Sequence, residues 1–155
     1  MLECKFGRGI AGMSRITVLV IDGQGGRIGK QLIEGIRAYA PDADVVAVGT
    51  NSVATGTMMK AGADRCATGE NAVVVNCRSA DVIAGPLGIA IADSMLGEIS
   101  PAMAVAVGQS RARRLLIPIS LCRSTVVGVS GRTIRELISM AVEEIRKICA
   151  GEAEA

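Results

Sequence analysis

Two consecutive stretches, ITVLVI at residues 16–21 and DGQGGRIGK at residues 22–30, decide how this region folds. The first is an unbroken apolar run rich in β-branched residues, which is typical of a strand covered on both faces of a parallel sheet. Behind the glycines, apolar residues recur at helical spacing, namely Ile28, Leu32, Ile33 and Ile36. Pro41 ends the helical pattern. The region therefore predicts a strand, a glycine-rich turn and a helix, an arrangement suited to holding an anion.

The same alternation of strands and helices continues along the chain. Further strands are predicted at residues 44–48, 65–67, 81–85, 115–117 and 125–129. Helices are predicted from a cap at Asn51 or Ser52 to Met59, over 70–77, from Ser100-Pro101 to about Ser110, and over 132–149. Residues 70–77 fit a helix or a strand, and we choose a helix capped by Thr68. In the last helix, Glu143 and Lys147 are expected to pair on the outer face.

Strands separated by helices predict an α/β fold with right-handed crossovers. We expect a Rossmann-like, doubly wound, mostly parallel sheet of about five or six strands with helices on both faces. The length of 155 residues fits one domain, placed at 14–149. Residues 1–13 are expected to be a loose extension, and 150–155 a C-terminal tail.

Composition narrows the functional classes. Half of the residues are apolar, but there is one Phe, one Tyr and no Trp, so the core is expected to be aliphatic. Without aromatic stacking platforms, and with a net charge of only +2, nucleic-acid binding is disfavoured. The longest uncharged stretch, 45–59, is too short to span a bilayer, and no secretory signal is evident. We expect a cytoplasmic protein that does not act at a membrane.

Cysteine and histidine usage argues against a metal site. The five cysteines form no CxxC pair and the chain has no histidine, so neither a zinc framework nor a disulfide scaffold is expected. The absence of histidine also excludes Ser-His-Asp and Cys-His catalysis. Buried packing is the favoured role for each cysteine, and Cys66 and Cys122 are the two worth testing for reactivity.

The glycine-rich turn misses both standard phosphate-loop patterns by specific residues. The dinucleotide fingerprint is G-x-G-x-x-G. If Gly23 is taken as its first glycine, Ile28 stands at the position of the third glycine. If Gly29 is taken as its third glycine, Gln24 stands at the position of the first. Gly49-Thr50-Asn51 stands where an acidic residue would hold a ribose. The nucleoside triphosphate loop would need Gly at 24 and Ser or Thr at 31, whereas both are Gln. An alternative interpretation is that the four glycines only permit a tight turn between strand and helix and bind no ligand.

The turns after parallel strands meet at one edge of a doubly wound sheet, which is the default ligand site. Asp22 and Glu70 are the candidate acid, base or nucleophile, although each has a structural alternative as a turn or helix-end residue. The predicted ligand-binding residues are Asp22, Gly23, Gln24, Gly25, Gly26, Arg27, Ile28, Gly29, Thr50, Asn51, Glu70, Asn71 and Gly85.

Several unusual blocks occur together in one order: IDGQGGRIGKQ, GTNSVATGTMMKAGA, ATGENAVVVN, DVIAGPLGIAIADSMLGEISPAMA and LLIPIS. From about Ser14 to Cys149, the chain resembles a family of short bacterial proteins known as domain of unknown function 3842. The resemblance implies a Rossmann-like fold without an assigned activity, and it suggests Met13 as a start.

Three functions are compatible with these features. The first is binding of a nucleotide or another phosphorylated small molecule at residues 22–30, with NADP among the possible cofactors. The second is a non-catalytic regulatory or scaffold homodimer, motivated by the excess of apolar residues at 87–106, although core packing would also explain it. The third is an NADP-linked oxidoreductase.

Overall fold

The computed structural model describes residues 14–119 and 124–152. Its centre is one parallel sheet with the strand order β3-β2-β1-β4-β5. The strands are β1 (Thr17–Asp22), β2 (Asp44–Gly49), β3 (Arg65–Thr68), β4 (Val82–Pro86) and β5 (Arg113–Ile117). The strand order reverses between β1 and β4, so the carboxyl ends of these two strands flank the usual ligand position of such sheets.

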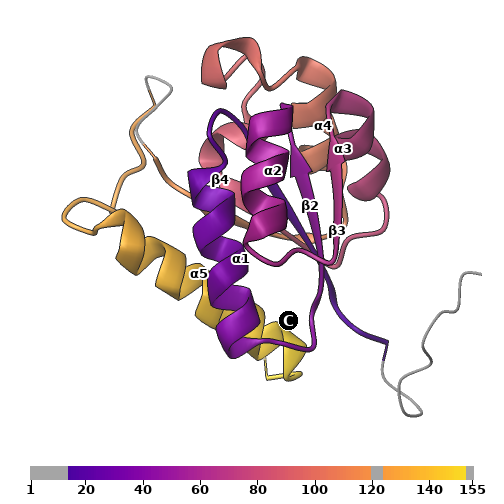
Figure 1. Ribbon diagram of the computed structural model, residues 1–155. Coiled ribbons are helices and arrows are strands. Elements are labelled where there is room, and N and C mark those ends of the chain that lie inside the picture. Colours follow the sequence, from indigo (N-terminus) through magenta and orange to yellow (C-terminus); the bar gives the residue numbers. More distant parts are fainter. Residues whose placement is uncertain (1–13, 120–123, 153–155) are drawn as a thin grey trace, which may run out of the picture.

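Helices cover both faces of the sheet, as expected of a doubly wound Rossmann-like fold (Figure 1). One face carries α1 (Arg27–Tyr39), α2 (Ser52–Lys60) and α5 (Ile134–Cys149). The other carries α3 (Glu70–Asn76), α4 (Pro101–Gln109) and the short 3-10 helices η1 (Leu87–Ala90) and η2 (Met95–Gly97). The predicted fold class is therefore confirmed.

The core explains why the stretch that forms β1 is apolar throughout. Val18 and Val20 point into the layer formed with α1 and α5, whereas Leu19 and Ile21 point into the layer formed with α3 and α4. All four side chains are 0% exposed. Burying each one stabilises the fold by about 1.5–3 kcal/mol, so an alternating polar pattern is not tolerated in this strand.

The strand predicted at Thr125–Val129 is wrong. Residues 124–126 have no regular structure and 127–128 form a turn, in which Gly128 has a φ of 93°. Val127 is 92% exposed, so its β-branched side chain packs in no core layer. High β-propensity in a short run does not make a strand when no layer covers it. The sheet in the described part of the chain consequently has five strands.

The ends of two helices also differ from the prediction. The last helix begins at Ile134, since Thr133 is its N-cap and forms a capping box with Glu136. The helix predicted over 70–77 is confirmed as α3, but its N-cap is Gly69, and the Thr68 hydroxyl instead lies 2.7 Å from that of Thr55.

The outer face of α5 carries different ion pairs from the predicted one. Glu143 pairs with Arg146, and Lys147 pairs with Glu144, both at a spacing of three residues. Pairs this accessible to solvent contribute little to stability, so we expect the exchange of partners to have little effect on the helix.

Two predictions about the chain ends fall largely outside the described residues. The predicted extension at 1–13 lies outside them, as does the part of the tail at 153–155.

Among the helices of the described part, none has the length and apolar character needed to cross a membrane.

Candidate functional site

The glycine-rich turn follows β1 directly and leads into α1. The amide of Gly26 donates to the carbonyl of Gly23 at 2.9 Å, which closes the turn. Gly26 is the N-cap of α1 with a φ of 69°, in the left-handed region that favours glycine. A Cβ at Gly26 would also come within 2.8 Å of the backbone of Ala54 in α2. The fold itself therefore demands this glycine, whatever the turn binds.

Asp22, the predicted acid or base, points inward and holds the turn. Its carboxylate accepts hydrogen bonds from the amides of Gly23 and Gly29, both at 2.8 Å, and the residue is 4% exposed. Burial raises the pKa of Asp22 above its usual value, against the lowering effect of the Gly29 and Gly23 hydrogen bonds. In this position Asp22 acts as an internal cap for the first turn of α1.

A second carboxylate, Glu98, lies against the turn and comes from the connection between β4 and α4. Its Oε2 accepts hydrogen bonds from the Gln24 amide at 2.8 Å, from the Asn51 side chain at 3.0 Å and from the Thr50 hydroxyl. Burial acts to raise the pKa of Glu98, but these three hydrogen bonds together hold it below its usual value. Glu98 thus joins the loops that follow β1 and β2.

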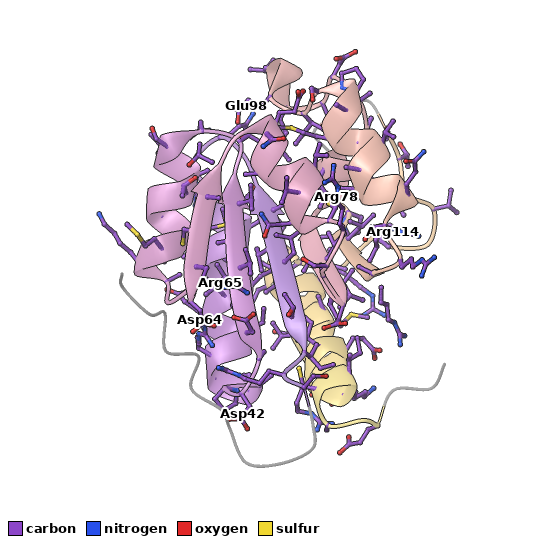
Figure 2. The ribbon with its side chains drawn as sticks, turned by 90° about the vertical axis from the view of Figure 1, so that its right-hand side faces the viewer. Asp42, Asp64, Arg65, Arg78, Glu98 and Arg114 are labelled. Carbon is purple, nitrogen blue, oxygen red and sulfur yellow. The ribbon has the colours of Figure 1, made fainter. Side chains whose placement is uncertain are left out.

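The position of Glu98 at one end of the sheet is plain in Figure 2, where Asp42 and Asp64 lie at the opposite end. Sequence reasoning missed this residue, because Glu98 is 74 residues from Gln24 and follows no recognisable motif. The only available signal was its charge within a mostly apolar segment.

On the β4 side of the turn lies a cavity of about 380 Å³. The turn supplies its polar floor, and Pro86, Met95, Ile119 and Ile134 supply apolar walls. Gly25 and Arg27 belong to this lining, and among the described residues no acceptor is found for their amides. The lining residues are Asp22, Gly23, Gln24, Gly25, Gly26, Arg27, Ile28, Gln31, Pro86, Met95, Ile119 and Ile134.

The predicted residues outside the turn are brought together only in part. Thr50 and Asn51 lie beside the turn, and the Asn51 side chain donates to the Gln24 carbonyl at 3.0 Å and accepts from the Ala54 amide at 2.9 Å. They contact its Glu98 side and are absent from the cavity lining. Thr50 and Asn51 therefore support the turn from the β2 side.

The remaining predicted residues, Glu70, Asn71 and Gly85, are also absent from the cavity lining. Glu70 accepts a hydrogen bond from the Ser100 hydroxyl and so links α3 to the start of α4, and Asn71 is exposed. Gly85 is buried in β4, where a Cβ would collide with the carbonyl oxygen of Ile21. These placements give Glu70 and Gly85 evident structural roles.

The cysteines of the described segments have the properties of packing residues. Burial raises the pKa of the Cys66 thiol, and it raises that of Cys77 to about 11. A thiol with a raised pKa holds little reactive thiolate at neutral pH. Cys122, the other candidate for reactivity, lies outside the described residues. Within residues 14–119 and 124–152, no three Cys, Asp or Glu side chains are grouped as metal ligands.

Comparison with known protein families identifies the chain. The family model described as Domain of unknown function (DUF3842) matches residues 17–150. The chain belongs to this family. The match includes the glycine-rich turn, the Glu98 connection and the five strands found in the described residues. No curated protein matches the chain.

Two solved structures are similar to the DUF3842 chain. A dodecameric FMN-dependent UbiX-like decarboxylase from Escherichia coli O157:H7 has 16% identity and a TM-score of 0.49, with 88% of this chain and 95% of that chain covered. A nucleoside-diphosphate-sugar epimerase from Pseudomonas aeruginosa has 18% identity and a TM-score of 0.46, and the alignment covers 90% of this chain and 50% of the epimerase.

The apolar segment 87–106, which motivated the homodimer hypothesis, is used mainly in the core. Met95, Ile99 and Met103 are 7%, 0% and 4% exposed and pack with the second core layer. Leu96 and Val105 are the exceptions, at 99% and 52% exposed. Most of the excess of apolar residues is therefore explained by packing within one chain, and the homodimer stays a prediction.

Proposed function

We propose that this DUF3842 protein binds a nucleotide or another phosphorylated small molecule, with the anionic group placed at the glycine-rich turn. The observation that carries the proposal is the cavity beside the turn, which is lined by Gly25 and Arg27, two residues whose amides have no acceptor in the described part of the chain. Amides at a helix N-terminus, together with the helix dipole, favour an anion at this position.

The beginning of α1 supports this proposal by comparison with other helices. The N-cap side chains Asn51, Ser100 and Thr133 accept amide hydrogen bonds at the starts of α2, α4 and α5. The N-caps of α1 and α3 are glycines without such a bond, but α3 has Glu70 in its first turn, whereas the first turn of α1 contains no acidic residue. The Asp22 carboxylate accepts the Gly29 amide, whereas Arg27 lines the cavity and its amide has no acceptor among the described residues.

The rest of the cavity suits the body of a small organic ligand. Its volume of about 380 Å³ lies within the range of roughly 300–1,000 Å³ that is usual for ligand sites. Apolar side chains form the walls away from the turn, so a flat ring or an aliphatic moiety would be desolvated there while its phosphate stays at the amides.

Thermal-shift measurements with AMP, GMP, cyclic nucleotides, FMN, NAD, NADP, ATP and GTP would test the proposal. A ligand at 100 times its Kd stabilises a protein by about 2.7 kcal/mol, or roughly 5–10 °C for a domain of this size. The NADP sample also tests the binding that an NADP-linked oxidoreductase requires.

Gly25→Val is the decisive variant. A Cβ at Gly25 meets only the Arg27 Cγ, at 3.9 Å, so valine fits the fold while its branched side chain covers the amide floor. Gly26→Val is unsuitable, since a side chain there would displace α2. Gly108→Val on α4, where a Cβ meets nothing within 4 Å, is the matched control. The proposal fails when no compound stabilises the protein at millimolar concentration, or when binding is unchanged in folded Gly25→Val.

A further inference from the structure

Glu98 contacts the turn beside the residues that follow β2, is not part of the cavity lining, and engages groups that a longer ligand would need there. Its Oε2 accepts the hydrogen bonds of the Gln24 amide and of the Thr50 and Asn51 side chains. A Cβ on Gly23 would come within 2.8 Å of this same oxygen. The carboxylate therefore packs directly on the Gly23-Gln24 peptide.

In doubly wound dinucleotide sites the pyrophosphate extends along the glycine turn, and the ribose reaches the end of the second strand. Here the end of β2 is continued by Thr50 and Asn51, and both of these side chains are bound to Glu98. A second phosphate at the Gln24 amide would have to displace a carboxylate that receives three hydrogen bonds. On the β4 side, the described residues provide no acceptor for the amides of Gly25 and Arg27, which line the cavity.

We propose that Glu98 determines ligand specificity by restricting the site to compounds with a single phosphate group and excluding diphosphates and dinucleotides. This inference rests on the function proposed above and adds the ligand class. Mononucleotides and small phosphorylated metabolites fit the class, whereas NAD, NADP and nucleoside diphosphates do not.

The local charge supports the same restriction. Two carboxylates, Asp22 and Glu98, flank the Gly23-Gln24 peptide, and Arg27 is the cation of the turn. Lys30, one helical turn further on, lies 3.8 Å from Glu34 and is directed to the outside of α1. One phosphate is balanced by Arg27 and the helix dipole. A second phosphate would add repulsion from two nearby acidic groups.

The backbone of the Glu98 segment is held in a defined shape. Asp93, Met95 and Leu96 have φ values of 63°, 55° and 59°, a sparsely populated region for such residues. Hydrogen bonds stabilise this conformation, including those from the Asp93 amide to Ile99 at 2.7 Å and from the Glu98 amide to Met95 at 3.2 Å. Strain of this kind persists where surrounding contacts enforce it. Glu98 is thus preorganised on the turn.

The test compares inorganic phosphate with pyrophosphate, and AMP with ADP, by isothermal titration calorimetry. Wild-type protein is expected to bind the monophosphate of each pair at least tenfold more tightly than the diphosphate. Glu98→Ala is expected to reduce this preference at least tenfold by strengthening diphosphate binding. Glu98→Gln preserves the side-chain shape, removes the charge and is expected to change the preference in the same direction.

Glu34→Ala is the matched control, because it removes one negative charge from the exposed side of α1. The Glu34→Ala variant should show the same ratio of monophosphate to diphosphate affinity as the wild-type protein. The inference is overturned when wild-type protein prefers pyrophosphate or ADP, or when both folded Glu98 variants keep the wild-type preference. If the wild-type protein prefers diphosphates and Gly25→Val abolishes this binding, the inference about Glu98 is refuted but the proposed function stands. Failure of every probe to bind any variant would refute the proposed function and the inference together.

Discussion

Replacement of Asp22 by asparagine separates a structural role of this residue from a chemical one. The two carboxylate oxygens accept different amides, Oδ1 that of Gly23 and Oδ2 that of Gly29. Asparagine keeps one acceptor oxygen and presents an NH₂ group to the other amide, so one buried donor loses its partner. A hydrogen bond to a charged group contributes about 1.5–3 kcal/mol.

Desolvation offsets part of the loss in Asp22→Asn. Burial raises the pKa of Asp22 despite the hydrogen bonds from Gly29 and Gly23, so removing the charge relieves a cost of folding. We therefore expect a net destabilisation of about 2 kcal/mol, near the lower end of the hydrogen-bond range. With a urea m-value of about 2 kcal/mol per molar, the unfolding midpoint shifts down by about 1 M.

Urea unfolding at pH 7, followed by circular dichroism, measures this shift. Asp42→Asn is the matched control, since Asp42 is exposed and its side chain lies at the opposite end of the sheet (Figure 2). A midpoint shift in Asp22→Asn no larger than that in Asp42→Asn would refute the internal-cap role. Loss of ligand binding at unchanged stability would instead assign Asp22 to the ligand.

Two further predictions concern stability. Leu96→Gly is expected to stabilise the protein by about 0.5–1 kcal/mol in urea unfolding, because Leu96 is 99% exposed and has a φ of 59°; destabilisation, or a loss of dimer in light scattering, would show that its side chain has a partner. Burial acts to raise the pKa of Asp64, but hydrogen bonds from Arg37 and the Val45 amide lower it below the ordinary 3.8. The ionised Asp64 therefore stabilises the folded protein above pH 3.8, and this contribution is lost as the pH falls and the carboxylate becomes protonated. Asp64→Asn should lower stability at pH 7 and flatten its decline below pH 4, and an unchanged acid profile would contradict this account.

Elements with local causes were predictable from sequence. The apolar run of β1 indicates burial on two faces, and Ser100-Pro101 combines a capping hydroxyl with a proline at the first helical position. The amphipathic pattern of α1 depends on residues three and four apart. Each of these signals lies within one or two turns of chain, so no tertiary information is needed to interpret it.

The failures share a different cause. Thr125–Val129 has strand composition, but whether it becomes a strand depends on a covering layer, and none is present at the exposed Val127. Thr68 is a good capping residue, yet Thr55 from another element engages its hydroxyl. In both cases a neighbour distant in sequence decides the outcome, and propensity carries no information about that neighbour.

The candidate site shows the same limit more sharply. Counting residues along the chain correctly finds that no acid ends the second strand, where Gly49-Thr50-Asn51 stands. In space a carboxylate does lie there, supplied by Glu98 from the connection after β4 and bound to Thr50 and Asn51. An acid that binds a ribose hydroxyl would favour a dinucleotide, whereas a carboxylate that occupies the position of the ribose would exclude one. Only the hydrogen bonds of Glu98 distinguish them, because its Oε2 is already engaged by the Gln24 amide as well as by both β2-end side chains.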